Sequence, residues 1–139
     1  MKSVFTDTVY WLATVVPSDQ WRESARKARD ELGPVRLVTT DEVLTEFLAA
    51  LSAGGEHIRR QAARFVTAIL DNPNVKVVPQ SRDSFLQGLQ LYEQRPDKGY
   101  SLTDCISMNI MRTEGLTEVL TNDHHFTQEG FTVLIQRPV

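Results

Sequence analysis

Short runs of β-branched residues alternate along this chain with longer segments of helical spacing, and this alternation restricts the fold more than any other feature of the sequence. Runs typical of strands lie at residues 4–5, 35–38, 75–78, 119–121 and 131–135. Such alternation is typical of parallel strands that are joined by helical crossovers. We therefore predict an α/β fold with a mostly parallel central sheet of about five strands, flanked by helices.

Signals for helix ends support this arrangement. Gly33 and Pro34 are expected to end a helix over residues 18–32. Residues 39–42 read TTDE, which has the spacing of a capping box and predicts a helix start. Ser81 is a candidate N-cap, and a helix is expected to open at residues 101–104. The apolar residues of that helix spread around most of its surface, so we expect it to pack on more than one side.

Composition limits the compartment and the organisation of the chain. The 139 residues, 41% of them hydrophobic, contain no long linker-like stretch, and we predict a single domain over residues 1–139. Cys105 is the only cysteine, so no intrachain disulfide can form, and no apolar run approaches the roughly 18 residues of a membrane span. We expect a cytoplasmic protein with no membrane contact. The net charge of -3 does not exclude a nuclease, because acidic residues that bind Mg²⁺ lower the formal charge.

Three aspartates occupy positions where a ligand site is expected. Asp7 and Asp123 follow predicted strands directly, and the carboxyl ends of parallel strands meet at one edge of a sheet. Asp104 lies in the first turn of an apolar helix, where burial without a partner would cost several kcal/mol. Two carboxylates about 4 Å apart repel by roughly 4 kcal/mol at an effective dielectric near 20, and a divalent cation reverses that sign. Converging acids without nearby basic residues therefore indicate Mg²⁺, with Mn²⁺ as the other ion considered.

Each acidic residue also has a purely structural interpretation. Asp104 stands three residues after Ser101, which fits an N-terminal capping arrangement. Asp7 and Asp123 could cap the turns that follow their strands. Glu46 lies roughly 130° around its helix from the centre of the apolar face, and spacing alone favours a solvated side chain there. Position in the sequence leaves these alternatives open.

Two other chemistries are disfavoured by the sequence. His124 and His125 beside Asp123 suggest zinc, yet adjacent residues seldom converge on one ion, and no cysteine or third histidine is near them in sequence. Cys105 has no identifiable activating base, which favours a buried cysteine over a nucleophile. The sequence also contains no Gly-rich phosphate loop and no nucleophile elbow.

Four segments together carry a family resemblance that covers nearly the whole chain. They are VFTDT at 4–8, TTDEVLTE at 39–46, KGYSLTD at 98–104 and LTNDHHF at 120–126. In this order they resemble the motifs of the PIN-domain ribonucleases, especially the VapC-type toxins of bacterial and archaeal toxin–antitoxin pairs. The resemblance implies a PIN fold in which Asp7, Glu46, Asp104 and Asp123 meet at the carboxyl edge of the sheet. It also makes Thr121 a candidate for orienting a carboxylate or a water.

The same resemblance implies a function. It indicates a Mg²⁺-dependent endoribonuclease that hydrolyses RNA phosphodiesters to a 5′-phosphate and a 3′-hydroxyl, and that acts as the toxin of a toxin–antitoxin pair. It further implies a small antitoxin protein that covers the active-site groove, and a homodimer. One departure concerns the metal: many relatives carry a further acid shortly after the fourth motif's Asp, whereas His124, His125 and Phe126 follow here.

Three other functions remain open on the sequence. A non-catalytic PIN-like module would bind RNA or protein without cutting, although the four acids are all present. A receiver domain would need a lysine at a late strand end, where this chain has Thr121, Asn122 and Asp123. A DNA-directed nuclease would use the same metal chemistry. Basic residues that could hold flanking phosphates are Arg59, Arg60, Arg64, Arg95, Lys98 and Arg112.

Overall fold

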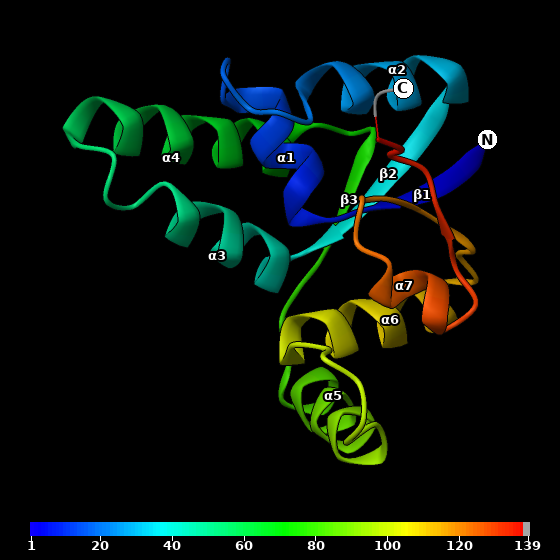
Figure 1. The fold of residues 1–139 in the computed structure, drawn as a ribbon. Coiled ribbons are helices and arrows are strands. Elements are labelled where there is room, and N and C mark those ends of the chain that lie inside the picture. The colour runs from blue at the N-terminus through cyan, green and yellow to red at the C-terminus, as the bar shows by residue number, and fades with distance from the viewer. Residues whose placement is uncertain (138–139) are drawn as a thin grey trace.

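The computed structural model describes residues 1–137, and within them a five-stranded sheet forms the centre of the molecule (Figure 1). Every pair of neighbouring strands is parallel, and the strand order is β3-β2-β1-β4-β5. The α/β fold with five strands is therefore confirmed. The strands are β1 (Lys2–Thr6), β2 (Val35–Thr40), β3 (Val75–Val78), β4 (Glu118–Leu120) and β5 (Thr132–Val133).

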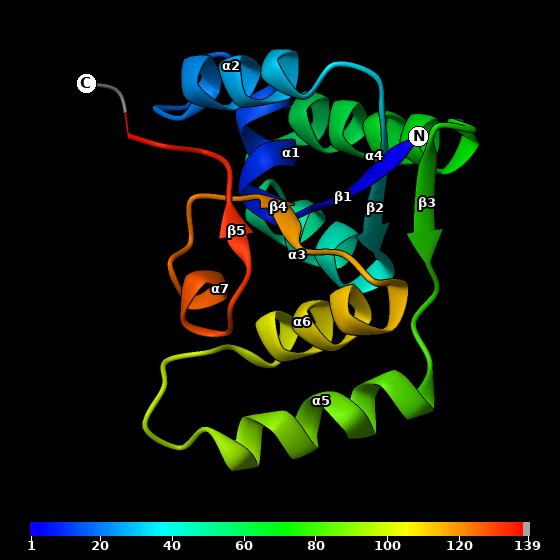
Figure 2. The ribbon, with the colours of Figure 1, turned by 90° about the vertical axis from the view of Figure 1, so that its right-hand side faces the viewer.

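Helices cover both sides of this sheet (Figures 1 and 2). They are α1 (Thr8–Val15), α2 (Arg22–Leu32), α3 (Asp41–Ala50), α4 (Glu56–Asp71), α5 (Arg82–Gln94), α6 (Leu102–Glu114) and α7 (His125–Gln128). The first four gather on one side, and α5 to α7 gather on the other. The two groups meet where α3 contacts α6.

The strand order creates a switch point beside β1. The chain builds β2 and β3 on one side of β1 and then returns to add β4 and β5 on the other side. Phe5 pairs with Val119 and Thr6 with Leu120, so β1 and β4 end together. The backbone N–H of Asp7 donates to the Leu120 carbonyl at 3.3 Å. In open parallel sheets the crevice at such a point is where ligands bind.

The core is tightly closed around α6. Met108 and Met111 of α6 are fully buried, as are Phe5 of β1, Phe47 of α3 and Phe126 of α7. Helix α6 contacts α5, α3 and α7, which confirms the prediction that it packs on more than one side. Burial of apolar surface stabilises a fold by about 25 cal/mol per Å². The burial of these large side chains therefore stabilises the packing of α6 in the core.

One predicted helix start is wrong, and a second helix starts where predicted but with a different cap. The strand at 35–38 continues to Thr40, and the N-cap of α3 is Thr40, whose hydroxyl accepts the Val43 N–H at 3.1 Å. Thr39 instead donates its hydroxyl to the Thr6 carbonyl at 3.0 Å, so the capping box predicted at 39–42 does not form. Helix α2 begins at Arg22 rather than at residue 18, because residues 17–21 form a turn in which Asp19 accepts the Trp21 N–H.

Helix α5 packs on α6 with only two of its residues buried, and its larger apolar side chains are exposed. Gly88 and Leu91 are its buried residues, and a Cβ at Gly88 would lie 2.5 Å from Cγ1 of Ile106. Its exposed apolar residues are Phe85, Leu86, Leu89 and Tyr92. Within residues 1–137, no helix combines the length and the apolar character that crossing a bilayer requires.

Candidate metal centre

The structure places the four predicted acids, Asp7, Glu46, Asp104 and Asp123, around the switch point, and we call this set the acidic site. Asp7 follows β1 directly and is 6% exposed. Its side chain makes no N-cap hydrogen bond to α1. The pKa of Asp7 is raised to about 7, mainly by burial and also by the negative charges of Asp104 and Glu46, while hydrogen bonds from Thr8 and Thr121 oppose the shift.

Thr121 connects the ends of β1 and β4. Its side chain is fully buried, and its hydroxyl donates to Oδ2 of Asp7 at 2.9 Å. The same hydroxyl oxygen accepts the backbone N–H of Asp123 at 3.2 Å. One side chain therefore fixes both the carboxylate after β1 and the backbone of the residue that carries the carboxylate after β4.

Asp104 serves in the capping box of α6 and in the acidic site at once. Ser101 Oγ accepts the Asp104 N–H at 3.0 Å, and Asp104 Oδ2 accepts the Ser101 N–H at 3.0 Å. The capping interpretation is confirmed. Burial raises the pKa of Asp104, and the nearby charge of Asp123 raises it further, while the Ser101 N–H opposes the shift. The capping box thus holds this carboxylate in an orientation that faces Asp123.

Glu46 reaches the acidic site from α3. Glu46 is exposed, as its helical position predicted, but its Oε1 accepts a hydrogen bond from the Thr8 hydroxyl at the start of α1. Its charge is close enough to raise the pKa of Asp7. The side chain therefore lies at the same edge as Asp7 rather than being free in solvent.

Asp123 and a histidine complete the arrangement. Asp123 Oδ1 accepts the backbone N–H of His125 at 2.9 Å, and His125 Nδ1 lies 3.3 Å from that oxygen and 3.3 Å from Oδ2 of Asp104. Asp104, Asp123 and His125 each offer a ligand atom, and these atoms all lie within 4.8 Å of one another. Asp7 and Glu46 adjoin this group but are not part of it.

The acidic site fits a divalent cation. Among residues 1–137, no lysine or arginine forms an ion pair with any of its four acids. Carboxylate oxygens suit Mg²⁺ and Mn²⁺, and an imidazole nitrogen suits transition metals. The raised pKa of Asp7 comes mainly from its burial, and the negative charges of Asp104 and Glu46 add to it.

Sequence reasoning missed the position of His125. It disfavoured the histidine pair because neighbours rarely share an ion, and the structure brings His125 to the acids while His124 is exposed. The sequence did contain one signal, which is that His125 follows Asp123 by two residues. An aspartate side chain can accept the backbone N–H of the residue two positions later, and such a turn keeps the two residues close together. The contacts of the imidazole with Asp104, 21 residues away, required the fold.

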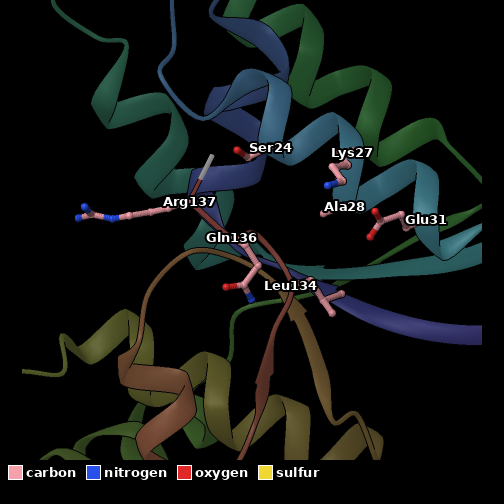
Figure 3. A pocket seen from close by; sticks show the side chains of 7 residues that line it. All are labelled: Ser24, Lys27, Ala28, Glu31, Leu134, Gln136 and Arg137. Carbon is pink, nitrogen blue, oxygen red and sulfur yellow. The ribbon is translucent and has the colours of Figure 1, made fainter. Parts of the chain in front are cut away.

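A separate hollow lies between α2 and the segment that follows β5 (Figure 3). Its lining residues are Ser24, Lys27, Ala28, Glu31, Leu134, Gln136 and Arg137. It shares no residue with the acidic site. Its lining mixes opposite charges with aliphatic side chains, and it gathers no set of metal-ligating residues.

Comparison with known proteins gives consistent relatives. The "23S rRNA-specific endonuclease VapC20" of Mycobacterium tuberculosis, from strains CDC 1551 / Oshkosh and ATCC 25618 / H37Rv, is 27% identical over 128 residues, which cover 92% of this chain and 95% of the relative. The crystal structure of M. tuberculosis VapC20, described as a sarcin-ricin loop cleaving toxin, superposes with a TM-score of 0.82 and 26% identity over 97% of this chain and 99% of that chain.

A more distant structure shares the fold alone. FitAcB from Neisseria gonorrhoeae superposes with a TM-score of 0.64 and 16% identity, over 94% of this chain and 96% of that chain. The family model described as "PIN domain" matches residues 4–131. That match runs from within β1 to the residue before β5 and includes the whole acidic site, so the chain belongs to the PIN domain family.

Proposed function

We propose that this protein is a metal-dependent endoribonuclease that hydrolyses RNA phosphodiesters and serves as the toxin of a toxin–antitoxin pair. The observation that carries the proposal is the acidic site, in which four acids from distant segments surround one sheet edge without a lysine or arginine counter-ion in residues 1–137. The similar mycobacterial VapC20 is named an endonuclease specific for 23S rRNA.

The proposed cofactor is a divalent cation of the kind that carboxylate oxygens bind, Mg²⁺ or Mn²⁺. Asp104 and Asp123 provide ligand atoms within 4.8 Å of each other, and Asp7 and Glu46 adjoin them from the end of β1 and from α3. A bound divalent ion supplies a water of lowered pKa and neutralises charge on the phosphoryl oxygens. Thr121 holds the carboxylate of Asp7 in place for this purpose.

In the proposed reaction, a water oxygen attacks phosphorus and the bond from phosphorus to the 3′ oxygen breaks. The products are a 5′-phosphate and a 3′-hydroxyl. One carboxylate accepts the proton of the attacking water, and Asp104 and Asp123 are the candidates for this role. The leaving 3′ oxygen takes a proton from solvent.

Some basic residues are better placed than others to hold flanking phosphates. Arg95 and Arg112 both pair with Glu129 and are engaged in the fold. Lys98 lies in the loop before α6, and its ion pair with Asp97 is long, at 3.7 Å. We therefore propose Lys98 as the phosphate contact closest in sequence to the acidic site.

The test is a panel of RNAs that includes 23S rRNA, incubated with the wild type and with Asp104→Asn. Matched single-stranded DNA separates an RNase from a DNA-directed enzyme. We expect Mg²⁺ or Mn²⁺ to support cleavage of RNA, and EDTA or Asp104→Asn to lower the rate by at least about 100-fold. Asp71→Asn, at the exposed end of α4, is the matched control and should cleave normally. Equal cleavage in excess EDTA would overturn the proposal.

We also propose the partners that the toxin function requires. A small antitoxin protein would bind across the acidic site, and a second copy of the chain would cover the apolar residues that α5 exposes. Light scattering should give a dimer for the wild type and a monomer for Leu86→Glu. A co-encoded small protein should form a stable complex and suppress RNA cleavage.

The organisation and the compartment remain proposals as well. Residues 1–139 are proposed to act as one domain, which the single sheet from β1 to β5 supports. The cytoplasm is the proposed compartment, because RNA is the proposed substrate. Limited proteolysis that releases a stable half of the chain would contradict the single domain.

A further inference from the structure

We propose that His125 is a nitrogen ligand of the metal ion at the acidic site, and that it makes this site select Mn²⁺ and similar transition-metal ions over Mg²⁺. This inference rests on the proposed metal dependence. It goes further by assigning a ligand role to His125 and a metal preference to the site.

The first support is the separation of the ligand atoms. His125 Nδ1 lies 3.3 Å from Asp104 Oδ2 and 3.3 Å from Asp123 Oδ1. Bonds of about 2.1 Å from one ion place neighbouring ligand atoms about 3.0 to 3.4 Å apart. The three atoms therefore already have the mutual spacing that one face of a coordination shell requires.

The second support is that each ligand atom is held by contacts within the fold. Asp104 Oδ2 accepts the Ser101 N–H, and Asp123 Oδ1 accepts the His125 N–H. Backbone donors that orient metal-ligating carboxylates are the usual supports around metal sites. Both oxygens are therefore held by backbone N–H groups, and neither hydrogen bond involves the imidazole.

The third support is the packing of the imidazole ring. Tyr100 contacts it edge to face, with ring centroids 5.3 Å apart and an interplanar angle of 64°. On the other side, a Cβ at Gly99 would lie 3.3 Å from Nε2 of His125, so the missing side chain leaves room for the ring. With Nε2 toward Gly99 and Tyr100 at the edge, Nδ1 is the nitrogen that faces the carboxylates.

The expected preference follows from ligand chemistry. Mg²⁺ binds oxygen ligands and rarely takes nitrogen, whereas Mn²⁺, Co²⁺ and Zn²⁺ accept imidazole. An acid at position 125 would supply oxygen and favour Mg²⁺. A histidine with the same reach changes the donor set from all oxygen to mixed oxygen and nitrogen.

The direct test uses Mn²⁺ alone as the probe, in the full chain. Pulsed EPR of the Mn²⁺-loaded wild type should show ¹⁴N coupling, and labelling the histidines with ¹⁵N should convert it to ¹⁵N coupling. His124→Asn is the matched control, since His124 is exposed and adjacent, and it should keep the signal. His125→Phe keeps a ring against Tyr100, removes the nitrogen and should lose the signal.

Calorimetry supplies a second readout that does not depend on catalysis. His125→Phe should weaken Mn²⁺ binding by about 10- to 100-fold and Mg²⁺ binding by less than about threefold. His125→Asp should restore an oxygen ligand and bring the ratio of the Mn²⁺ and Mg²⁺ affinities down by about tenfold. If His125→Phe does not fold, the ¹⁵N experiment on the wild type still decides the question.

Failure of this inference can be told from failure of the proposed function. Mn²⁺ that binds in an Asp104-dependent manner without histidine nitrogen coupling overturns the role of His125 and leaves the metal-dependent nuclease intact. Nitrogen coupling that persists in His125→Phe also overturns it. A wild type that binds neither Mn²⁺ nor Mg²⁺ overturns both.

Discussion

Glu129 and Asp7 both have carboxylates largely shielded from solvent, yet their surroundings differ completely. The side chain of Glu129 is 6% exposed and accepts hydrogen bonds from Arg95 at 3.0 Å, Arg112 at 2.9 Å and Tyr100 at 2.8 Å. Burial alone would raise the pKa of Glu129, but these three donors lower it to about 2. Asp7, with acids around it, has a pKa of about 7.

The difference shows how one residue type serves two purposes in one molecule. The Glu129 cluster, which we define as Glu129, Arg95, Arg112 and Tyr100, supplies its own cations and joins α7 and its following residue to α6 and to the loop before it. The acidic site brings carboxylates together, and within residues 1–137 no lysine or arginine pairs with them. Desolvated carboxylates that the fold does not neutralise are a mark of function rather than of stability.

The largest expected effect is on Asp7, and it has opposite signs for stability and activity. A folded-state pKa of about 7 against 3.8 means that the folded state holds a proton which the unfolded state has released, so stability falls as the pH rises from about 4 to about 7. The full shift corresponds to up to about 4 kcal/mol. Asp7→Asn should remove this slope, stabilise the metal-free protein at pH 8 and lower RNA cleavage by at least about 100-fold.

Urea unfolding in EDTA between pH 4.5 and 8 measures the slope. Asp71→Asn should keep the pH dependence of the wild type, because its carboxylate is exposed at the end of α4. Added Mn²⁺ should stabilise the wild type and leave Asp7→Asn nearly unchanged. A wild type whose stability rises between pH 5 and 7 in EDTA would show that Asp7 is neutralised within the fold.

The next effect concerns Glu129 and has the reverse pH dependence. Its lowered pKa contributes stability that is present above pH 4.5 and is lost as the pH falls through about 2. Glu129→Gln should lower the free energy of unfolding by about 2 to 3 kcal/mol at pH 7. This loss is at or below the low end for a broken buried ion pair, because both arginines are partly exposed and can be solvated by water. Urea unfolding at pH 7 and pH 3 should show this loss shrinking at the lower pH. Equal losses at both values would mean that shape, rather than charge, holds the cluster.

Much of the fold could be predicted because its signals are local. The strand runs, the helix end at Gly33 and the caps at Ser81 and Ser101 all depend on neighbours within a few residues. The cap at Thr40 was missed because Thr39 has the capping-box spacing to Glu42. Pairing of β2 with β1 and β3 extends the strand through Thr40, and sequence spacing does not contain that information.

Site residues that directly follow a strand could be placed from the sequence, and the other site residues could not. Asp7 and Asp123 could be placed from strand ends alone, whereas Glu46 depended on the family resemblance, because its helical position indicated solvent. Contacts such as Thr121 with Asp7 cross 114 residues, and His125 reaches Asp104 across 21. Pairings of that range are set by the strand order, so only the folded chain reveals which polar side chains orient the acids.

Thr121 allows a finer test of the acidic site. Thr121→Val keeps the shape of the side chain but removes the hydroxyl that donates to Asp7 and accepts from Asp123. We expect the pKa of Asp7 to rise, the unfolding free energy at pH 8 to fall by about 1 kcal/mol, and metal affinity to fall by about tenfold. NMR titration of the Asp7 carboxyl carbon measures the first of these. Thr121→Ser should restore all three, and a Thr121→Val protein with unchanged metal affinity would limit the hydroxyl to a structural role.

The smallest effect is expected at Tyr100, where the two regions touch. Its hydroxyl donates to Glu129, while its ring contacts the imidazole of His125. Tyr100→Phe removes the hydroxyl alone, so stability should fall by about 0.5 to 1 kcal/mol and metal affinity should stay within about twofold, because two arginines still hold Glu129 and the ring still packs. Tyr100→Ala removes the ring and should weaken Mn²⁺ binding as well, which calorimetry can detect. If Tyr100→Phe weakened metal binding as much as Tyr100→Ala, the hydrogen bond to Glu129 would be what positions the Tyr100 ring. The Glu129 cluster would then help to determine metal affinity at the acidic site.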